Sequence, residues 1–214
     1  MFNYELMQPK RMVLKQISER NFNFVKNCLP LIKKKEVKII FDVGANAGTF
    51  SASFCELFID AHIYSFEPVY KNYIYLIENI DKLGLTNRVS CFNIGFWKYP
   101  CTKSLGMPVK KRNDPDNIGL YSIYGTDNVV EAKFDSMNNW CNTHNIWPDI
   151  MKMDCEGSEP KILKGATQVL DKVKYMIIEH SKNDGISKII NKDFTLSDKP
   201  VEKGGNRFWV KNRS

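Results

Sequence analysis

Hydrophobic positions fall along the chain in two alternating patterns, short continuous runs and helically spaced sets. The runs are rich in β-branched and aromatic residues, which is typical of strands buried in a sheet. We expect strands over residues 36–43, 62–66, 89–94, 132–134, 149–154, 175–179 and 207–210. Between the runs, hydrophobic residues recur at three- and four-residue spacing, as on one face of a helix. We expect helices over residues 10–35, 50–58, 73–83, 136–144 and 160–170.

Several positions mark where these helices begin and end. Asp135 or Ser136 can cap the helix that follows them, and Ser158 can cap the next one. Gly84 is placed to end the helix before it. Residues 95–128 show neither pattern and are rich in Gly, Pro, Asn and aromatic residues, so we expect loops or a hairpin there.

The alternation of strands and helices predicts an α/β fold. We expect one Rossmann-like domain with a mostly parallel twisted sheet, helices on both faces and an N-terminal helix. A length of 214 residues suits a single domain. The expected division is a helical extension over residues 1–35 and a domain over residues 36–214, with a substrate-facing excursion at about 95–130. In such sheets ligands bind beyond the carboxyl ends of the strands, so the residues after each strand are the candidates for a site.

Composition narrows the class of protein further. The formal net charge is +7, which is compatible with anionic partners, but no nucleic-acid motif accompanies it and we expect no nucleic-acid partner. No stretch reaches the ~20 continuous apolar residues of a membrane span, and residues 1–11 resemble neither a signal peptide nor an anchor. The six cysteines form no CxxC pair, so we expect reduced thiols in a cytoplasmic protein and no zinc site.

The strand over 36–43 ends in a glycine-containing turn. Gly44 and Gly48 allow the backbone to approach a ligand closely, and Asn46 tolerates a left-handed conformation. The turn lacks the P-loop pattern, and Asn46 and Thr49 stand where a dinucleotide fingerprint needs glycine or alanine. A Gly-x-Asn-x-Gly turn suits a ligand without a pyrophosphate, such as S-adenosylmethionine.

An acidic residue ends the next strand. Glu67 lies 23 residues after Gly44, close to the ~20-residue spacing of an acid that binds ribose hydroxyls. A carboxylate can accept hydrogen bonds from both hydroxyls. A third element follows a later strand, the sequence Lys152-Met153-Asp154-Cys155-Glu156-Gly157-Ser158-Glu159. The combination of these three elements is more specific than any one of them.

As a set, these stretches resemble the FkbM family of S-adenosylmethionine-dependent methyltransferases. The resemblance rests on residues 41–48, 66–68, 134–137, 151–159 and 177–179. It implies a class I methyltransferase fold and O-methylation, often of sugar hydroxyls in glycans or glycosylated metabolites. The acceptor it implies is a small molecule or an oligosaccharide, and the oligomeric state stays open.

The same resemblance implies which residues contact S-adenosylmethionine. The glycine turn, the acid after it and the segment after the third strand are the implied contacts. The residues assigned to cofactor binding are Asp42, Gly44, Asn46, Gly48, Glu67, Pro68, Asn93 and Ile94. At the third strand the sequence departs from the more usual family pattern Ala-Leu-x-Asp.

Methylation of a hydroxyl needs a base to accept its proton. Asp154 ends a strand at the expected site and is the first candidate, and Glu156 follows two residues later. Together they are also able to hold a divalent ion, although we assign no metal site. His180, after the strand over 175–179, is a third candidate. Lys152 points to the same face of the sheet as Asp154, where it can pair with a carboxylate or lie under a helix.

The excursion contributes aromatic residues whose role the sequence leaves open. Tyr121 and Tyr124, like Phe92, Phe96, Trp97 and Tyr99, suit either stacking on a sugar or adenine ring or packing in the core.

Three other functions compete with methylation of a sugar. An RNA methyltransferase would use the positive charge to bind phosphates, but we find no Lys-Asp-Lys-Glu tetrad of the cap-modifying type. A non-catalytic module would keep the fold and S-adenosylmethionine binding alone. A nicotinamide-dependent reductase is disfavoured by the glycine spacing.

Overall fold

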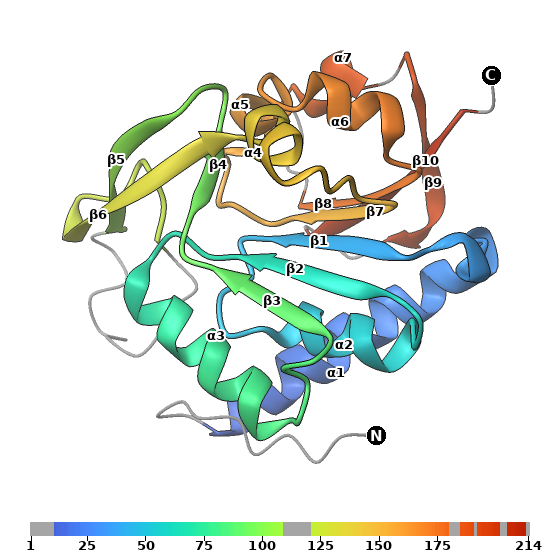
Figure 1. The fold of residues 1–214 in the computed structure, drawn as a ribbon, viewed down its shortest axis with the longest axis horizontal. Helices are drawn as coiled ribbons and strands as arrows, with labels where there is room; N and C mark the ends of the chain where they lie inside the picture. The colour runs from blue at the N-terminus through green and yellow to red at the C-terminus, as the bar shows by residue number, and fades with distance from the viewer. Residues whose placement is uncertain (1–10, 109–120, 180–184, 191, 202–204, 213–214) are drawn as a thin grey trace.

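The computed structural model of the chain describes residues 11–108, 121–179, 185–190, 192–201 and 205–212. At its centre is a seven-stranded sheet in the order β3-β2-β1-β7-β8-β10-β9 (Figure 1). The strands of this sheet are β1 (Ile39–Val43), β2 (His62–Phe66), β3 (Val89–Phe92), β7 (Ile150–Met153), β8 (Tyr175–Glu179), β9 (Phe194–Val201) and β10 (Asn206–Lys211). The strands from β3 to β8 are parallel, and β10 runs antiparallel to β8 and β9. The expected mostly parallel sheet is confirmed.

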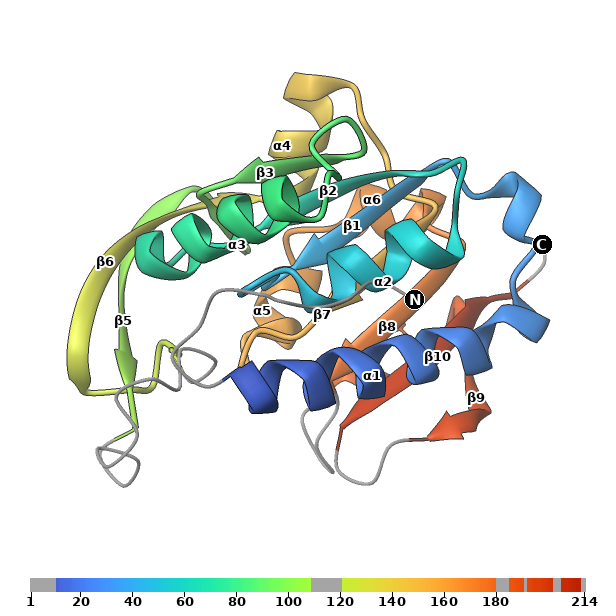
Figure 2. The same cartoon turned by 90° about the horizontal axis from the view of Figure 1, so that it is seen from below.

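Helices cover both faces of the sheet, as expected (Figures 1 and 2). One face carries α1 (Arg11–Cys28), α2 (Thr49–Leu57) and α3 (Tyr70–Lys82). The other face carries α4 (Met137–His144), α5 (Glu159–Leu163), α6 (Thr167–Lys172) and α7 (Ile186–Ile190). Neighbouring residues of a strand point to opposite faces, so each strand supplies both cores. Ile40 of β1 packs under α2, whereas Phe41 packs on the side of α4.

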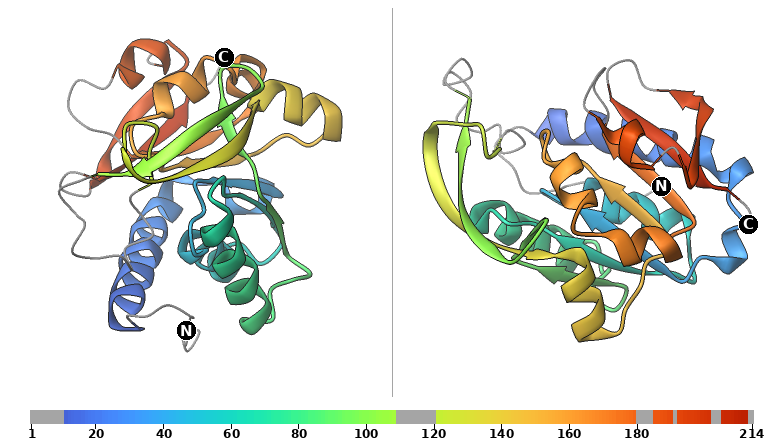
Figure 3. Two further views of the ribbon diagram at one scale, coloured as in Figure 1. Left: turned by 90° about the vertical axis from the view of Figure 1, so that its left-hand side faces the viewer. Right: turned by 90° about the horizontal axis from the view of Figure 1, so that it is seen from above.

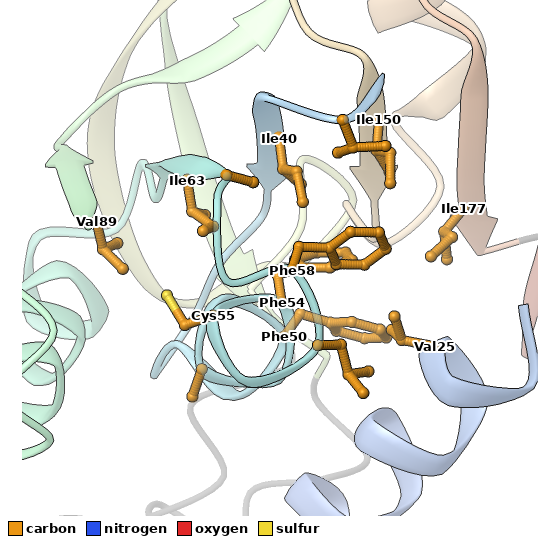
Figure 4. Packing of buried hydrophobic residues seen from close by; sticks show 14 of the residues in the cluster. Val25, Ile40, Phe50, Phe54, Cys55, Phe58, Ile63, Val89, Ile150 and Ile177 are labelled. Atoms are coloured by element: carbon orange, nitrogen blue, oxygen red, sulfur yellow. The ribbon is translucent and has the colours of Figure 1, made fainter. Parts of the chain in front are cut away.

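The spacing of three phenylalanines explains how α2 seats on the sheet. Phe50, Phe54 and Phe58 are four residues apart, so they project from one side of the helix. Figure 4 shows them in one cluster with Ile40 and Ile150 of the central strands and with Val25 of α1. All of these side chains are buried. The hydrophobic period that predicted a helix over 50–58 is therefore the contact between this helix and the core.

Two predicted helices are shorter than expected. The helix over 10–35 ends at Cys28, and two 3₁₀ turns follow it, Leu29–Leu31 and Lys34–Glu36. Pro30 lies in the first of these turns; it lacks the N–H that would continue the α-helix.

The helix expected over 160–170 is two helices, α5 and α6, with Gly165 between them. A Cβ atom at Gly165 would lie 2.4 Å from the carbonyl oxygen of Trp97, so the chain bends where it meets another backbone. Ser158 precedes α5 but its side chain makes no capping hydrogen bond, so that expectation was wrong. Instead, Oε1 of Glu159 accepts a 2.6 Å hydrogen bond from the N–H of Cys155.

The other end signals are confirmed. Oγ of Ser136 accepts a hydrogen bond of 3.1 Å from the N–H of Asn139 and so caps α4. Gly84, with φ of +67°, follows the end of α3. A cap that the sequence did not indicate comes from Asn138, whose Oδ1 accepts from the N–H of Gln168 in the first turn of α6.

The excursion forms a second sheet of three strands in the order β4-β6-β5. These strands are β4 (Gly95–Trp97), β5 (Cys101–Met107) and β6 (Asp127–Ser136). Seen from the side in Figure 3, this small sheet stands beyond the carboxyl ends of the parallel strands. Four of its buried residues pack on Val69, just after the end of β2; they are Trp97, Leu105, Ala132 and Phe134.

All six cysteines carry free thiols, as expected. Burial raises the pKa of five of them, to about 11 for Cys55, to about 12 for Cys91 and Cys141, and well above the usual value for Cys28 and Cys155. Such thiols stay protonated at neutral pH, which is typical of packing rather than of nucleophilic cysteines. Within the described residues, no helix is long and apolar enough to cross a membrane.

Candidate functional site

The glycine loop, residues 44–48, joins β1 to α2 at the carboxyl edge of the sheet. Its backbone is left-handed at Gly44, Asn46 and Gly48, with φ values of +72°, +50° and +87°. A Cβ atom at Gly44 would lie 2.1 Å from the carbonyl oxygen of Asp154, so only glycine fits there. The left-handed conformation expected for Asn46 is confirmed. The backbone of the loop is therefore in contact with the backbone of Asp154, in the acidic motif of residues 152–159.

A buried ion pair supports the glycine loop from below. Nζ of Lys152 lies 3.0 Å from Oδ1 of Asp42 and donates a 2.9 Å hydrogen bond to the carbonyl oxygen of Gly44. Oγ of Ser51 donates to the other carboxylate oxygen of Asp42 at 2.6 Å. Burial works to lower the pKa of Lys152, but the carboxylates of Asp42 and Asp154 outweigh it and hold that pKa above its usual value. Both roles expected for Lys152 are observed, because it pairs with Asp42 and also lies under α2, where its Nζ is 4.9 Å from the centroid of the Phe50 ring.

This arrangement places Asp42 beneath the loop. Its side chain is fully buried and engaged by Lys152 and Ser51. Asp42 therefore holds the loop in shape, and its predicted contact with a cofactor stays a prediction.

Glu67 directly follows β2 beside the glycine loop. Oε2 of its carboxylate accepts from the N–H of Asn46 and Oε1 from the N–H of Val69, both at 2.9 Å. Asn72 adds a side-chain hydrogen bond. Burial raises the pKa of Glu67 to about 7, against the lowering effect of these hydrogen bonds. A carboxylate has roughly four acceptor positions. In Glu67 the hydrogen bonds from Asn46, Val69 and Asn72 use three of them, so one is left for a ribose hydroxyl. A second hydroxyl would be accepted only if Asn72 moved away.

The other predicted cofactor residues meet at the ends of β2 and β3. Nδ2 of Asn93 donates to the carbonyl oxygens of Glu67 and Pro68, at 2.9 and 3.1 Å. Asn93 is exposed, whereas Ile94 is partly buried against the α4 side of the core. The structure therefore joins the Glu67 strand end to the segment predicted to approach adenine.

The acid turn, residues 154–157, follows β7. The N–H of Asp154 donates to the carbonyl oxygen of Val43 at 3.2 Å, and this ties the turn to the start of the glycine loop. Glu156 and Gly157 are left-handed, with φ values of +52° and +88°. A non-glycine residue in this conformation is uncommon, and such strain gathers at functional sites.

Glu179 is a site residue that our sequence analysis did not assign a role. It ends β8, which lies in parallel register with β7, so Glu179 and Asp154 leave the sheet side by side. Their side chains share a hydrogen bond. Burial, and then the nearby carboxylates of Asp154, Glu156 and Glu159, raise the pKa of Glu179 to about 8. The raised pKa favours the protonated form of Glu179, which can donate the hydrogen bond that it shares with Asp154. An acid at the end of the neighbouring strand was the signal available in the sequence.

Two questions about catalysis remain from the sequence analysis, the role of His180 and the presence of a metal site. His180 lies outside the described residues. Among the residues that the structure does describe, no group of three or more His, Cys, Asp or Glu side chains is arranged to hold a metal ion.

The aromatic residues divide between core and surface. Phe92 and Phe96 pack against Trp140, and Trp97 is buried in the small sheet, so these three belong to the core. Tyr124 is different, because it is 66% exposed. A Cβ atom at Gly157 would lie only 3.6 Å from its ring, so Tyr124 stands beside the acid turn.

The chain is similar in sequence to known methyltransferases. Residues 42–194 match the family described as the methyltransferase FkbM domain. The hexuronic acid methyltransferase AglP of Haloferax volcanii is 26% identical over 160 residues, which cover 71% of this chain and 59% of AglP. The 2-O-methyltransferase NoeI of Sinorhizobium fredii is 21% identical over 164 residues, which cover 71% of this chain and 66% of NoeI. The chain thus spans about three fifths to two thirds of these relatives.

The fold is also similar to solved structures. An O-methyltransferase family protein from Burkholderia thailandensis superposes with a TM-score of 0.54 at 8% identity, covering 94% of this chain and 56% of that one. This similarity confirms the expected class I, Rossmann-like fold.

Proposed function

The chain belongs to the FkbM methyltransferase family, and from this we propose that it transfers a methyl group from S-adenosylmethionine to a sugar hydroxyl. One observation carries the proposal. The glycine loop contacts both acids that the reaction needs, Glu67 through the N–H of Asn46 and Asp154 through the backbone at Gly44. A donor site and a base therefore share one edge of the sheet, as in other open α/β folds.

The chemistry of the glycine loop suits the cofactor. Oδ1 of Asn46 is buried and has no hydrogen-bond partner among the described residues, so it offers an acceptor for an ammonium group. Glu67 offers an acceptor to the ribose. Gly44 and Gly48 keep side chains away from the loop, and residues 93 and 94 would lie toward the adenine. When bound, S-adenosylmethionine supplies a methyl group on a positively charged sulfur, which a hydroxyl oxygen can attack.

Asp154 is the proposed base. Its carboxylate would accept the proton of the acceptor hydroxyl as the hydroxyl oxygen takes the methyl group and the carbon–sulfur bond of the donor breaks, which leaves S-adenosylhomocysteine. The hydrogen bond between Glu179 and Asp154 orients the carboxyl group of Asp154. Glu156 and His180 stay second candidates for contact with the acceptor.

The choice of a sugar rests on the relatives. One acts on a hexuronic acid and the other is a 2-O-methyltransferase. The relatives are longer than this chain, so their acceptors are a guide to the class of substrate only. A cytoplasmic location, expected from the thiols, is part of the proposal.

Two measurements test the function. Calorimetry should detect binding of S-adenosylmethionine and of S-adenosylhomocysteine; binding of neither compound would remove the enzyme hypothesis. A methyl-transfer screen should then compare p-nitrophenyl glycosides, nucleotide sugars and short RNAs, and we expect product from a glycoside alone. Methylated RNA without glycoside turnover would favour the RNA enzyme. Binding without turnover on any acceptor would favour a non-catalytic module.

A further inference from the structure

The small sheet spans the edge where the proposed site lies. At one end it packs on Val69, two residues beyond Glu67. At the other end, Tyr124 lies against Gly157, three residues beyond Asp154. The small sheet, which stands beyond the carboxyl ends of the parallel strands in Figure 3, therefore reaches from the Glu67 side of the proposed site to the Asp154 side.

The turn that carries Tyr124 is held firmly to the small sheet. Ser122 and Gly106 exchange two backbone hydrogen bonds of 2.9 Å. The N–H of Tyr124 donates to Oγ of Ser122 at 3.3 Å. Gly125 lies so close to Gly106 that a Cβ atom there would be 1.8 Å from the carbonyl oxygen of Gly106. The ring is thus exposed on a fixed backbone, which lowers the entropy lost when a ligand stacks on it.

We propose that Tyr124 is the platform on which the sugar ring of the acceptor stacks, with the hydroxyl to be methylated directed at Asp154. This inference rests on the proposed function and assigns its acceptor subsite. A pyranose ring has one face made of C–H groups, and the electron-rich face of an aromatic ring attracts such partly positive hydrogens. Rigid aromatic surface next to a few polar groups is the usual composition of a small-molecule site.

The charges beside Tyr124 indicate which sugars fit. The acid turn supplies the carboxyl groups of Asp154 and Glu156, and the protonated form of Glu179 adds no further negative charge. Carboxylates accept hydrogen bonds from hydroxyls but repel a second carboxylate. The favoured acceptor is therefore an uncharged pyranoside rather than a hexuronate.

The test compares three variants in methyl transfer to p-nitrophenyl glucoside, fucoside and glucuronide. Tyr124→Ala removes the ring, Tyr124→Phe keeps it, and Tyr99→Ala is a matched control. Tyr99 is also an exposed tyrosine of the small sheet, but it lies in the turn between β4 and β5, away from Gly157. We expect Tyr124→Ala to raise KM for the neutral glycosides about tenfold, equivalent to about 1.4 kcal/mol. The other two variants should stay within about twofold of wild type.

A second readout does not depend on turnover. Saturation-transfer NMR with the protein loaded with S-adenosylhomocysteine should show strong transfer to the protons of one sugar face, and Tyr124→Ala should lose it. Calorimetry should show unchanged affinity of that variant for S-adenosylhomocysteine.

The outcomes separate the two proposals. If wild type methylates a glycoside and Tyr124→Ala does so with unchanged KM, the platform is wrong and the proposed function stands. Preference for the glucuronide would overturn the assignment of an uncharged acceptor. If wild type binds the cofactor but methylates no glycoside, the proposed function fails and the platform fails with it.

Discussion

The raised pKa of Glu67 gives the most specific test of the donor site. Burial puts this pKa at about 7, whereas an exposed glutamate titrates near 4.5. If ribose hydroxyls donate to the carboxylate, a ligand with a ribose binds the ionised form more tightly. Its affinity should then rise as the pH rises through about 7 and level off above it.

The size of the effect follows from the pKa. Near pH 5, about two units below the pKa, roughly one molecule in 100 carries Glu67 ionised, and restoring the charge costs about 3 kcal/mol. Affinity should therefore fall by up to about 100-fold between about pH 8 and pH 5. Stability of the free protein moves the other way. The folded-state pKa is above the unfolded value, so the contribution of Glu67 to stability is fully present below about 4.5 and is lost as the pH rises to about 7.

The assay is calorimetry with 5′-methylthioadenosine, which carries the ribose and adenine but lacks the amino-acid group that would titrate in the same range. Glu67→Gln is the control. In a glutamine an NH2 group replaces one of the two oxygens that accept from Asn46 and Val69, so one of these N–H donors would face another donor, and the side chain does not titrate. We expect weak binding that does not change with pH, and a free protein whose unfolding loses part of its pH dependence. Equal affinity of wild type at about pH 5.5 and pH 8 would refute the assignment of the ribose to Glu67.

Four further predictions concern the proposed base and residues that stabilise the site or the fold around it. Lys152→Met leaves the buried carboxylate of Asp42 unpaired and should destabilise the protein by about 3–5 kcal/mol in denaturant unfolding. Asp154→Asn should keep the calorimetric affinity for S-adenosylhomocysteine and lower kcat at least about 100-fold; wild-type turnover would exclude Asp154 as the base. Glu179→Gln mimics the protonated acid, so it should remove the loss of thermal stability that wild type shows as the pH rises from about 4.5 to about 8; a parallel decline in both proteins would contradict the raised pKa of Glu179. Gly165→Ala should destabilise by about 1–3 kcal/mol, because the bend between α5 and α6 would no longer seat on β4.

The parts of the fold that the sequence predicted are those whose signal is local. The strand over 62–66 has the same bounds in the structure, because its hydrophobic run coincides with its burial between two neighbours. β5 was missed because its first residues alternate between partly buried and exposed, so no hydrophobic run marks it. The break at Gly165 was missed because its cause, the backbone of Trp97, is distant in the sequence.

The site residues also differ in whether a local sequence signal indicates them. Short, contiguous stretches of sequence indicate the left-handed glycine loop and Glu67, so both could be predicted without knowing the fold. The partner of Asp154 could not, since Glu179 is 25 residues away and meets it only through the register of β7 and β8. Tyr124 reaches Gly157 through the small sheet, whose pairing the sequence did not reveal.

Lys152 of the acidic motif connects the two parts of the proposed site, the glycine loop and the proposed base Asp154. Lys152 lies two residues before Asp154 on β7, and its Nζ holds the carbonyl oxygen of Gly44 in the glycine loop. A shift of this strand would therefore move the base and the loop together. Transfer of a methyl group requires donor and acceptor atoms within a few tenths of an ångström of the reactive geometry. The ion pair between Lys152 and Asp42 fixes that relation below the reacting groups, where substrates do not disturb it.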